Sequence, residues 1–312
     1  MNPFRKLLVV HPGALGDLVL TFPILLALRK QFDSLDILCG AGQGALAVHL
    51  GIADQWFWRE SARFSGLYQP SISDPELSEF MKKYDDVLLF SLSESPEAAI
   101  RSVPGPRVWR IPPRPPVGRR IHVIDFIQNE MKNAGWELAP ETMPGGKKSS
   151  SGSVFLHPGS GSPRKNWDLD GFLAVSKALR AHGFPTEFLM GPAESAWKAA
   201  VLDRGEDVLA PESLVALAER LEGAAGLIGN DSGASHLAAF LGLPTVAIFG
   251  PSDPARWRPS GLRVAVVAGS APICPACFEE PERPECVDRP CLAGISPESV
   301  INAFFSVFSP SP

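Results

Sequence analysis

Short apolar runs alternate with longer amphipathic stretches along this chain, and few folds are compatible with such a pattern. The apolar runs are rich in Leu, Val and Ile, and they have the length of strands in a parallel sheet. In the first half we expect strands at 7–11, 35–39, 55–58, 87–91 and 107–109, with helices at 18–32, 76–83 and 122–135. This order predicts an α/β fold.

The alternation stops once and then restarts. Residues 140–153 read "PETMPGGKKSSSGS", which has no apolar period and is typical of a linker. Beyond them we expect strands at 154–157, 186–190, 226–229 and 245–249, with helices at 169–181, 195–202, 214–221, 233–241 and 297–308. The pattern predicts two domains, 1–143 and 154–312, joined by a linker at 144–153, with the last helix able to pack back on the first domain.

Length and composition exclude several classes of protein. The 312 residues are enough for two domains, and 45% of them are hydrophobic. A net charge of −5 argues against a general nucleic-acid binder, and no apolar run is long enough for a transmembrane helix. The N-terminus lacks the pattern of a signal peptide, so we expect a cytoplasmic protein.

The two halves begin alike, with "VVHPGALG" at 9–16 and "FLHPGSGS" at 155–162. In each, a buried strand runs into His-Pro-Gly and a glycine-containing turn. The likeness predicts two doubly wound, Rossmann-like domains that face each other across a cleft. In such sheets ligands bind beyond the carboxyl ends of the strands, where free N–H groups and helix N-termini suit a diphosphate.

The first strand-to-helix turn, "HPGALGD", carries two glycines and an aspartate. Gly13 and Gly16 permit a tight turn and a close approach of the backbone to a bound donor. Asp17 stands where a helix begins. It either caps that helix or acts as a general base that accepts a proton from a hydroxyl nucleophile.

The second turn, "HPGSGSPRK", places a hydroxyl, a glycine and a lysine close together. Ser160 and Gly161 offer a hydroxyl and open N–H groups, and Lys165 can neutralise phosphate as a point charge. A solvated basic pair on the surface is the alternative, but the neighbouring glycines and serines favour a phosphate site.

The third turn lies in "IGNDSGASHLAAFLGLPTVAIFGPSDPARW" at 228–257. Ser232 is expected to cap a helix, and His236 follows four residues later on the same face. Asp231 or His236 can bind a ribose hydroxyl, whereas Ser232 and Gly233 suit a phosphate oxygen. For His236, a satisfied place inside the core is the alternative.

Together the turns resemble a known family. "GALGDLVLTFPILLALR", "HPGSGSPRKNWDLDGF" and the 228–257 stretch are similar to segments of glycosyltransferase family 9, the heptosyltransferase-like enzymes of the lipopolysaccharide inner core. "HVIDF" at 122–126 and "ISPESV" at 295–300 extend the resemblance over nearly the whole chain. It implies the GT-B architecture, with the acceptor bound mainly by the first domain and the nucleotide sugar by the second.

The resemblance also implies roles for individual residues. Asp17 matches the proposed catalytic base, and Ser160 and Lys165 match positions that contact phosphate. Glu194, in "GPAES", matches an acidic residue that holds the ribose of the nucleotide. The donor-sugar and diphosphate loop of the family is matched by Asp231, Ser232, Gly233 and His236.

The family transfers an activated heptose, typically ADP-linked, with inversion at the anomeric carbon. We therefore expect an inverting heptosyltransferase that acts on a lipid-linked, anionic saccharide at the cytoplasmic face of the inner membrane. Inversion needs one carboxylate to deprotonate the acceptor, and a diphosphate leaving group needs positive charge rather than an acid. No acidic pair has clear Mg²⁺ spacing, so we expect metal-independent transfer without a cofactor.

One departure from the family leaves the substrates open. Relatives often carry Asp-x-Gln-Gly after the strand at 87–91, whereas this chain has "FSLSESPEAA". A sugar-nucleotide epimerase of the same architecture and a non-catalytic binder of nucleotide sugars or glycans are the alternatives. A nicotinamide oxidoreductase is weaker, because "ILCGAGQGALAVHL" at 37–50 lacks the glycine spacing of a dinucleotide site.

Two further features lie outside the turns. Residues 101–120 hold six arginines, six prolines and no acidic residue, and we expect Arg114, Arg119 and Arg120 to bind an anionic acceptor or the anionic membrane leaflet. A solvated loop stiffened by proline is the alternative.

The other feature is a group of four cysteines near the C-terminus, with the spacing C-x2-C-x8-C-x4-C. Four thiolates could hold a structural Zn²⁺. Reduced thiols or a disulfide are the alternatives. The candidate ligands are Cys274, Cys277, Cys286 and Cys291.

Overall fold

The computed structural model describes residues 4–139, 141, 152–269, 277–278, 286 and 289–308. These residues form two compact units. The first unit takes in the described residues up to 116 and from 123 to 141, and the second takes in 117–122 and the described residues from 152 onward. Most of the predicted linker, 144–151, lies outside the described residues.

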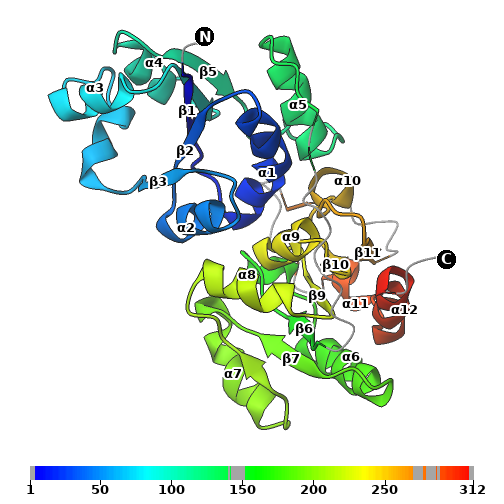
Figure 1. The fold of residues 1–312 in the computed structure, drawn as a ribbon. Helices are drawn as coiled ribbons and strands as arrows, with labels where there is room; N and C mark the ends of the chain where they lie inside the picture. The colour runs from blue at the N-terminus through cyan, green and yellow to red at the C-terminus, as the bar shows by residue number, and fades with distance from the viewer. Residues whose placement is uncertain are drawn as a thin grey trace. The chain divides into compact units, whose positions relative to one another are not determined.

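The first unit is built on a five-stranded parallel sheet of order β3-β2-β1-β4-β5 (Figure 1). Its strands are β1 (Lys6–Val10), β2 (Ser34–Cys39), β3 (Gln55–Trp58), β4 (Asp86–Phe90) and β5 (Arg107–Ile111). The chain leaves β1 toward β2 and β3 and then crosses to β4 on the other side of β1. The gap between β1 and β4 is therefore the topological switch point, where ligands of such sheets bind.

Helices cover both faces of this sheet, which explains why its central strands are almost wholly apolar. One layer contains the 3₁₀ helix η1 (Ala62–Tyr68), α3 (Pro75–Met81) and α4 (Ser95–Arg101), packed on side chains such as Leu8 and Leu89. The other contains α1 (Leu15–Arg29), α2 (Ala41–His49) and α5 (Val123–Asn133). In this layer α2 can approach the ring of Trp56 closely because Gly44 has no side chain.

The second unit is built on a six-stranded parallel sheet of order β11-β10-β9-β6-β7-β8. Its strands are β6 (Val154–His157), β7 (Thr186–Leu189), β8 (Val208–Leu209), β9 (Gly226–Asn230), β10 (Thr245–Phe249) and β11 (Val264–Ala268). Here the switch point falls between β6 and β9, which pair directly. The second and third predicted turns follow these two strands, so the sheet order places them side by side.

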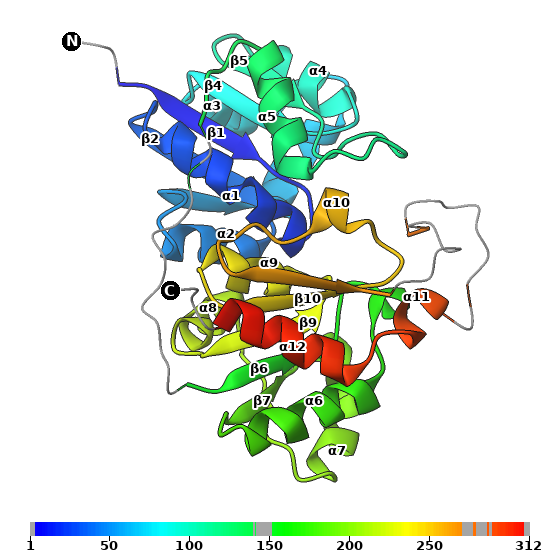
Figure 2. The same ribbon diagram turned by 90° about the vertical axis from the view of Figure 1, so that its right-hand side faces the viewer.

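The helices of the second unit are also arranged on both faces of its sheet. They are η2 (Pro163–Lys165), α6 (Leu169–Ala181), η3 (Pro192–Glu194), α7 (Ser195–Leu202), α8 (Leu214–Glu222), α9 (Gly233–Phe240), α10 (Pro254–Trp257), α11 (Pro290–Ala293) and α12 (Pro297–Phe308). α12 runs along the sheet beside α6 (Figure 2), with Val300 and Phe304 in the core of this unit. The apolar face that we expected to be able to pack back on the first domain is thus used within the second unit.

The predicted fold class, α/β with two parallel sheets, is confirmed. α1 begins at Leu15, three residues before its predicted start, so Asp17 lies in its first turn. The segment 117–122, expected in the first domain, belongs to the second unit. Among the helices of the described ranges, none combines the length and the apolar character that a membrane span requires.

Candidate functional site

Lys165 and Asp231 form an ion pair at the carboxyl edge of the second sheet. Lys165 Nζ lies 2.9 Å from Asp231 Oδ2, and the two side chains are only 17% and 5% exposed. The ammonium group also lies 4.5 Å from the ring centroid of Phe278, a cation–π contact. The structure therefore brings the second and third turns together and makes Lys165 a half-buried charge with a fixed direction rather than a freely solvated one.

Three groups surround the carboxylate of Asp231. Ser252 Oγ donates a hydrogen bond of 2.6 Å to Oδ2, and His236 Nε2 lies 3.6 Å from Oδ1. Burial alone would raise the pKa of Asp231, but the nearby His236 ring, the charge of Lys165 and the hydrogen bond from Ser252 hold this pKa well below its usual range. Asp231 thus stays ionised and serves as a fixed negative charge rather than as an acid.

The third turn forms a helix N-terminus as predicted. Ser232 caps α9 by accepting from the amide of Ser235 at 3.4 Å, and Gly233 is the first residue of the helix. His236 is 4% exposed, so it lies in the interior, yet it faces Asp231 rather than a purely apolar core. The switch point of this unit therefore brings together the positive N-terminus of α9, the ammonium group of Lys165 and the carboxylate of Asp231.

The second turn is a structured loop, residues 158–167, which we call the β6 loop. Ser160 Oγ lies 2.6 Å from Asn166 Oδ1 and 2.7 Å from the carbonyl oxygen of Ser162, so its hydroxyl shapes the loop itself. Gly161 is exposed, and a Cβ there would meet open space. The backbone at Gly161 is therefore accessible to a ligand.

Glu194 also reaches the β6 loop. Its side chain is buried, and Oε2 accepts from the amide of Gly191 at 2.7 Å. A Cβ at Gly159 would overlap the Glu194 carboxylate, so the glycine is required by this close approach. The structure thus joins Glu194 to the other predicted donor residues of the second unit.

In the first unit, Asp17 holds the turn that follows β1. Its Oδ2 accepts from the amide of Ala14 at 3.1 Å, which is the capping role expected at the start of α1. A Cβ at Gly13 would lie 2.8 Å from both Asp17 Cβ and His11 Cε1, so only glycine fits between them. Gly13 and Gly16, predicted to bind the donor, lie in this unit, whereas the other predicted donor residues lie in the second.

Sequence reasoning assigned no role to the two histidines of the His-Pro-Gly repeats. His11 Nδ1 accepts from the amide of Gly13 at 3.3 Å, and burial lowers the pKa of His11 to about 3. His157 Nδ1 donates to the carbonyl oxygen of Leu189 at 3.0 Å, and burial lowers its pKa as well. The repetition of the tripeptide after two predicted strands was the signal that could have found them.

The sequence model of a family described as glycosyltransferase family 9 (heptosyltransferase) matches residues 126–287. This range is more than half of the chain and contains the β6 loop, Glu194 and the third turn. The chain belongs to glycosyltransferase family 9. The match confirms the predicted recognition. Two of the three segments on which that prediction rested, 157–172 and 228–257, lie in this range, and "GALGDLVLTFPILLALR" at 13–29 lies outside it.

Individual proteins of known family resemble this chain in sequence or in structure. Lipopolysaccharide heptosyltransferase 1 of Pseudomonas aeruginosa is 32% identical over 130 residues, which cover 41% of this family 9 chain and 36% of that protein. A family 9 glycosyltransferase structure from Veillonella parvula has a TM-score of 0.75 at 20% identity, covering 98% of this chain and 97% of its own. Escherichia coli heptosyltransferase WaaC with ADP has a TM-score of 0.71 at 17% identity, covering 98% and 100%. The GT-B fold class is thereby confirmed.

The arginine-rich segment of this family 9 protein is divided between the two units. Arg114 lies in the first unit, and Arg119 and Arg120 lie in the second. Arg120 Nε and Nη2 bind the carboxylate of Asp253 at 2.8 and 3.3 Å, and Arg256 donates to the carbonyl oxygen of Arg119. The charge of Arg120 is therefore paired, which weakens the prediction that all three arginines form one anion-binding patch.

The predicted zinc site is only partly within the described residues. Cys277, Cys286 and Cys291 are described and form no disulfide with one another, whereas Cys274 lies outside the described residues. Among the described side chains, no group of three or more His, Cys, Asp or Glu is placed to hold a metal ion. Zinc binding by these cysteines stays a prediction.

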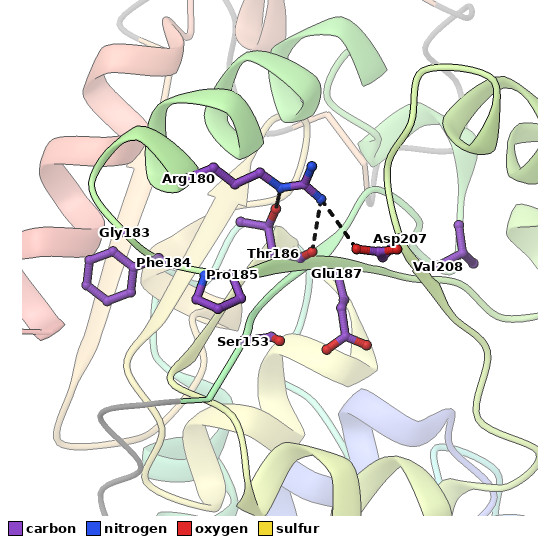
Figure 3. A pocket seen from close by; sticks show the side chains of 9 residues that line it. All are labelled: Ser153, Arg180, Gly183, Phe184, Pro185, Thr186, Glu187, Asp207 and Val208. Atoms are coloured by element: carbon purple, nitrogen blue, oxygen red, sulfur yellow. Dashed lines mark hydrogen bonds and ion pairs between the residues drawn. The ribbon is translucent and has the colours of Figure 1, made fainter.

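A hollow of about 600 Å³ lies at the opposite, amino-terminal edge of the second sheet (Figure 3). Arg180 is the cation beside it, but its guanidinium donates to Thr186 Oγ1 at 2.8 Å and pairs with Glu206 at 2.9 Å. Because the carboxylates of Glu187, Glu206 and Asp207 outnumber this one cation, the hollow is a poor site for a phosphate. The candidate site therefore remains the carboxyl edge.

Proposed function

We propose that the protein is an inverting glycosyltransferase that moves a heptose from a nucleotide-diphosphate donor, ADP-heptose in the first instance, to an acceptor of the lipopolysaccharide inner-core type. The observation that carries this proposal is the ion pair between half-buried Lys165 and buried Asp231 at the switch point of the second sheet. A lysine held in this way supplies fixed positive charge where parallel sheets bind phosphate.

The donor is assigned to the second unit. Lys165 and the N-terminus of α9 stabilise the diphosphate as it leaves, because both place positive charge at preset positions. Glu194 offers carboxylate oxygens to the ribose hydroxyls. Asp231 keeps Lys165 oriented through the ion pair, and the low pKa of Asp231 keeps that pair charged.

The base is assigned to Asp17 in the first unit. The acceptor hydroxyl attacks the anomeric carbon from the face opposite the leaving group while its proton passes to the Asp17 carboxylate. The new bond joins the acceptor oxygen to the anomeric carbon, and the bond from that carbon to the diphosphate oxygen breaks. The electron pair leaves with the diphosphate, so the step needs neither a protein acid nor a metal ion.

The experiment that tests the proposal is turnover of ADP-heptose, with and without a heptose-free inner-core acceptor. We expect glycosylated acceptor and free ADP only when both substrates are present. An altered sugar formed without acceptor would identify an epimerase instead, and unchanged donor in both mixtures would identify a binding protein.

The acceptor and the place of the reaction are further parts of this proposal. We assign Arg114 and Arg119 to the anionic acceptor or to the anionic leaflet, at which a cytoplasmic enzyme could act peripherally. Both side chains are exposed. Replacing Arg114 and Arg119 with Gln should reduce acceptor use and binding to anionic liposomes, and unchanged values for both would end this assignment.

The C-terminal cysteines are proposed to hold one structural Zn²⁺. Four thiolates in tetrahedral arrangement are the usual ligand set for such a site. Metal analysis of gently purified protein should give about one zinc per chain. A clearly substoichiometric value would leave the cysteines as reduced thiols or a disulfide.

A further inference from the structure

We propose that Asn230 is a positioning residue that fixes the shape of the β6 loop before the donor binds. The inference rests on the proposed function only in naming the ligand of that loop as a nucleotide diphosphate. Asn230 is the last residue of β9 and is fully buried. It lies beside the switch point but belongs to none of the groups assigned to donor chemistry above.

The side chain of Asn230 holds both ends of the β6 loop. Its Nδ2 donates to the carbonyl oxygen of Pro158 at 2.7 Å, and its Oδ1 accepts from the amide of Trp167 at 3.0 Å. The segment enclosed by these two bonds contains Ser160, Gly161 and Lys165. A single amide therefore closes the loop that presents the predicted phosphate-binding groups.

Only an amide of this length can make both bonds at once. The carbonyl of Pro158 can only accept and the N–H of Trp167 can only donate, which fixes the orientation of the amide. A carboxylate at position 230 could not donate to Pro158, and an apolar side chain could make neither bond. Asparagine is therefore the residue whose side chain matches both the carbonyl oxygen of Pro158 and the amide of Trp167.

The neighbouring residues hold Asn230 itself in place. Ser235 Oγ donates to the carbonyl oxygen of Asn230 at 2.7 Å, which fixes the backbone from which the side chain projects. Asp231, the next residue, binds Lys165 near the end of the loop. Asn230, the last residue of β9, and Asp231, which follows it, thereby hold the β6 loop at Pro158, Lys165 and Trp167.

This arrangement has a consequence for binding. A loop that is ordered before the ligand arrives does not lose conformational entropy on binding, so affinity is higher than for a loop that orders only around the ligand. Removing both bonds also leaves two buried backbone groups without a partner, which favours other loop conformations. We therefore expect the Asn230→Ala variant to bind ADP roughly tenfold more weakly.

The test compares Asn230→Ala with Ser176→Ala. Ser176 is also fully buried in the second unit, and its hydroxyl lies 2.7 Å from Thr186 Oγ1 and from Glu206 Oε2 at the other edge of the sheet. Both variants should lower the melting temperature. Only Asn230→Ala should weaken ADP binding by calorimetry and raise the donor KM much more than it lowers kcat.

A second measurement reads the loop directly. Hydrogen exchange of the Trp167 amide should be slow in the wild type, fast in Asn230→Ala, and slow again when ADP is bound to the variant. ADP affinity within twofold of wild type, or an unchanged Trp167 exchange rate in the folded variant, would overturn the proposal. If the wild type binds no ADP, the proposed donor fails, and the exchange rate decides the role of Asn230 on its own.

Discussion

The two units follow their central strands with the same tripeptide, His-Pro-Gly, but use its histidine in opposite ways. In the first unit His11 Nδ1 accepts from Gly13, so the ring proton is on Nε2. In the second, His157 Nδ1 donates to Leu189, so the proton is on Nδ1. Burial lowers both pKa values, so neither ring is charged near neutral pH.

The partners of these histidines show how the two turns differ. His11 and Asp17 bind the amides of Gly13 and Ala14, so the turn of the first unit is tied mainly to itself. His157 binds a neighbouring strand, and the β6 loop that follows it is held by Asn230 at the end of β9 and by Asp231 just beyond it. The same motif is therefore followed by a carboxylate in the first unit and, in the second, by a lysine that Asp231 holds through an ion pair.

The largest expected effect comes from Asp17→Asn. The amide cannot accept the proton of the acceptor hydroxyl, so we expect transfer to fall by a factor of about 10² to 10⁴. ADP binding should stay unchanged, because Lys165 and Glu194 belong to the second unit and an amide oxygen can still accept from Ala14, which preserves the turn that contains Gly13 and Gly16. Steady-state transfer and ADP calorimetry on the same preparation check this, and near-wild-type transfer would remove Asp17 from the mechanism.

Lys165→Met tests the role of the β6 loop in the second unit. The variant loses the phosphate-binding charge and leaves Asp231 buried without its cation, so we expect ADP binding to weaken by roughly 10- to 100-fold and stability to fall. Lys177→Met, at an exposed position of α6 in the same unit, is the matched control. Equal ADP affinity in the two variants would contradict the assignment of Lys165.

The third prediction concerns the buried carboxylate of Asp86, in the first unit, and how its contribution to the free energy of unfolding depends on pH. Burial would raise the pKa of Asp86, but hydrogen bonds from Arg107, Trp109 and Arg5 lower it. Because the folded pKa lies below the unfolded value, this stabilisation is present above about pH 4 and is lost as the pH falls through the folded pKa.

Asp86→Asn should therefore cost about 3 kcal/mol of unfolding free energy at pH 7, and the difference from wild type should shrink below about pH 4. Urea unfolding at several pH values, followed by circular dichroism, measures this. A difference that grows as the pH falls would mean that the sign of the pKa shift is wrong.

The smallest effect concerns the histidine tautomers themselves. Long-range ¹H–¹⁵N spectra should show the proton of His11 on Nε2 and that of His157 on Nδ1. Asn at either position can present the acceptor or donor that Nδ1 supplies, so His11→Asn and His157→Asn should each lose only about 1 kcal/mol from changed packing and hydrogen bonding. Identical tautomers would remove the contrast between the two turns.

Much of the fold could be predicted because its signal is local. The strands at 55–58, 154–157 and 245–249 were predicted with the bounds that the structure has, since each is an apolar or aromatic run with a clear end. α2 was not predicted, because the glycines in "AGQGALAVH" weaken its helical pattern. The contact of Gly44 with Trp56, twelve residues away, helps to hold it in place.

In the candidate site, too, the residues with a local sequence signal could be predicted and the others could not. Asp17, Lys165 and Asp231 could be found because each follows a predicted strand in a turn rich in glycine and serine. Asn230 and Ser252 could not, because their roles depend on which strands are neighbours. Asn230 binds Pro158 from 72 residues away, and Ser252 binds Asp231 only because β10 pairs with β9.

Mapping of ADP on the wild-type protein shows whether the switch point of the second sheet holds the donor diphosphate. In an amide NMR titration, we predict the largest shift changes in the β6 loop around Lys165 and at Ser232 and Gly233. Changes confined to the first unit, with the β6 loop unaffected at saturating ADP, would contradict the account.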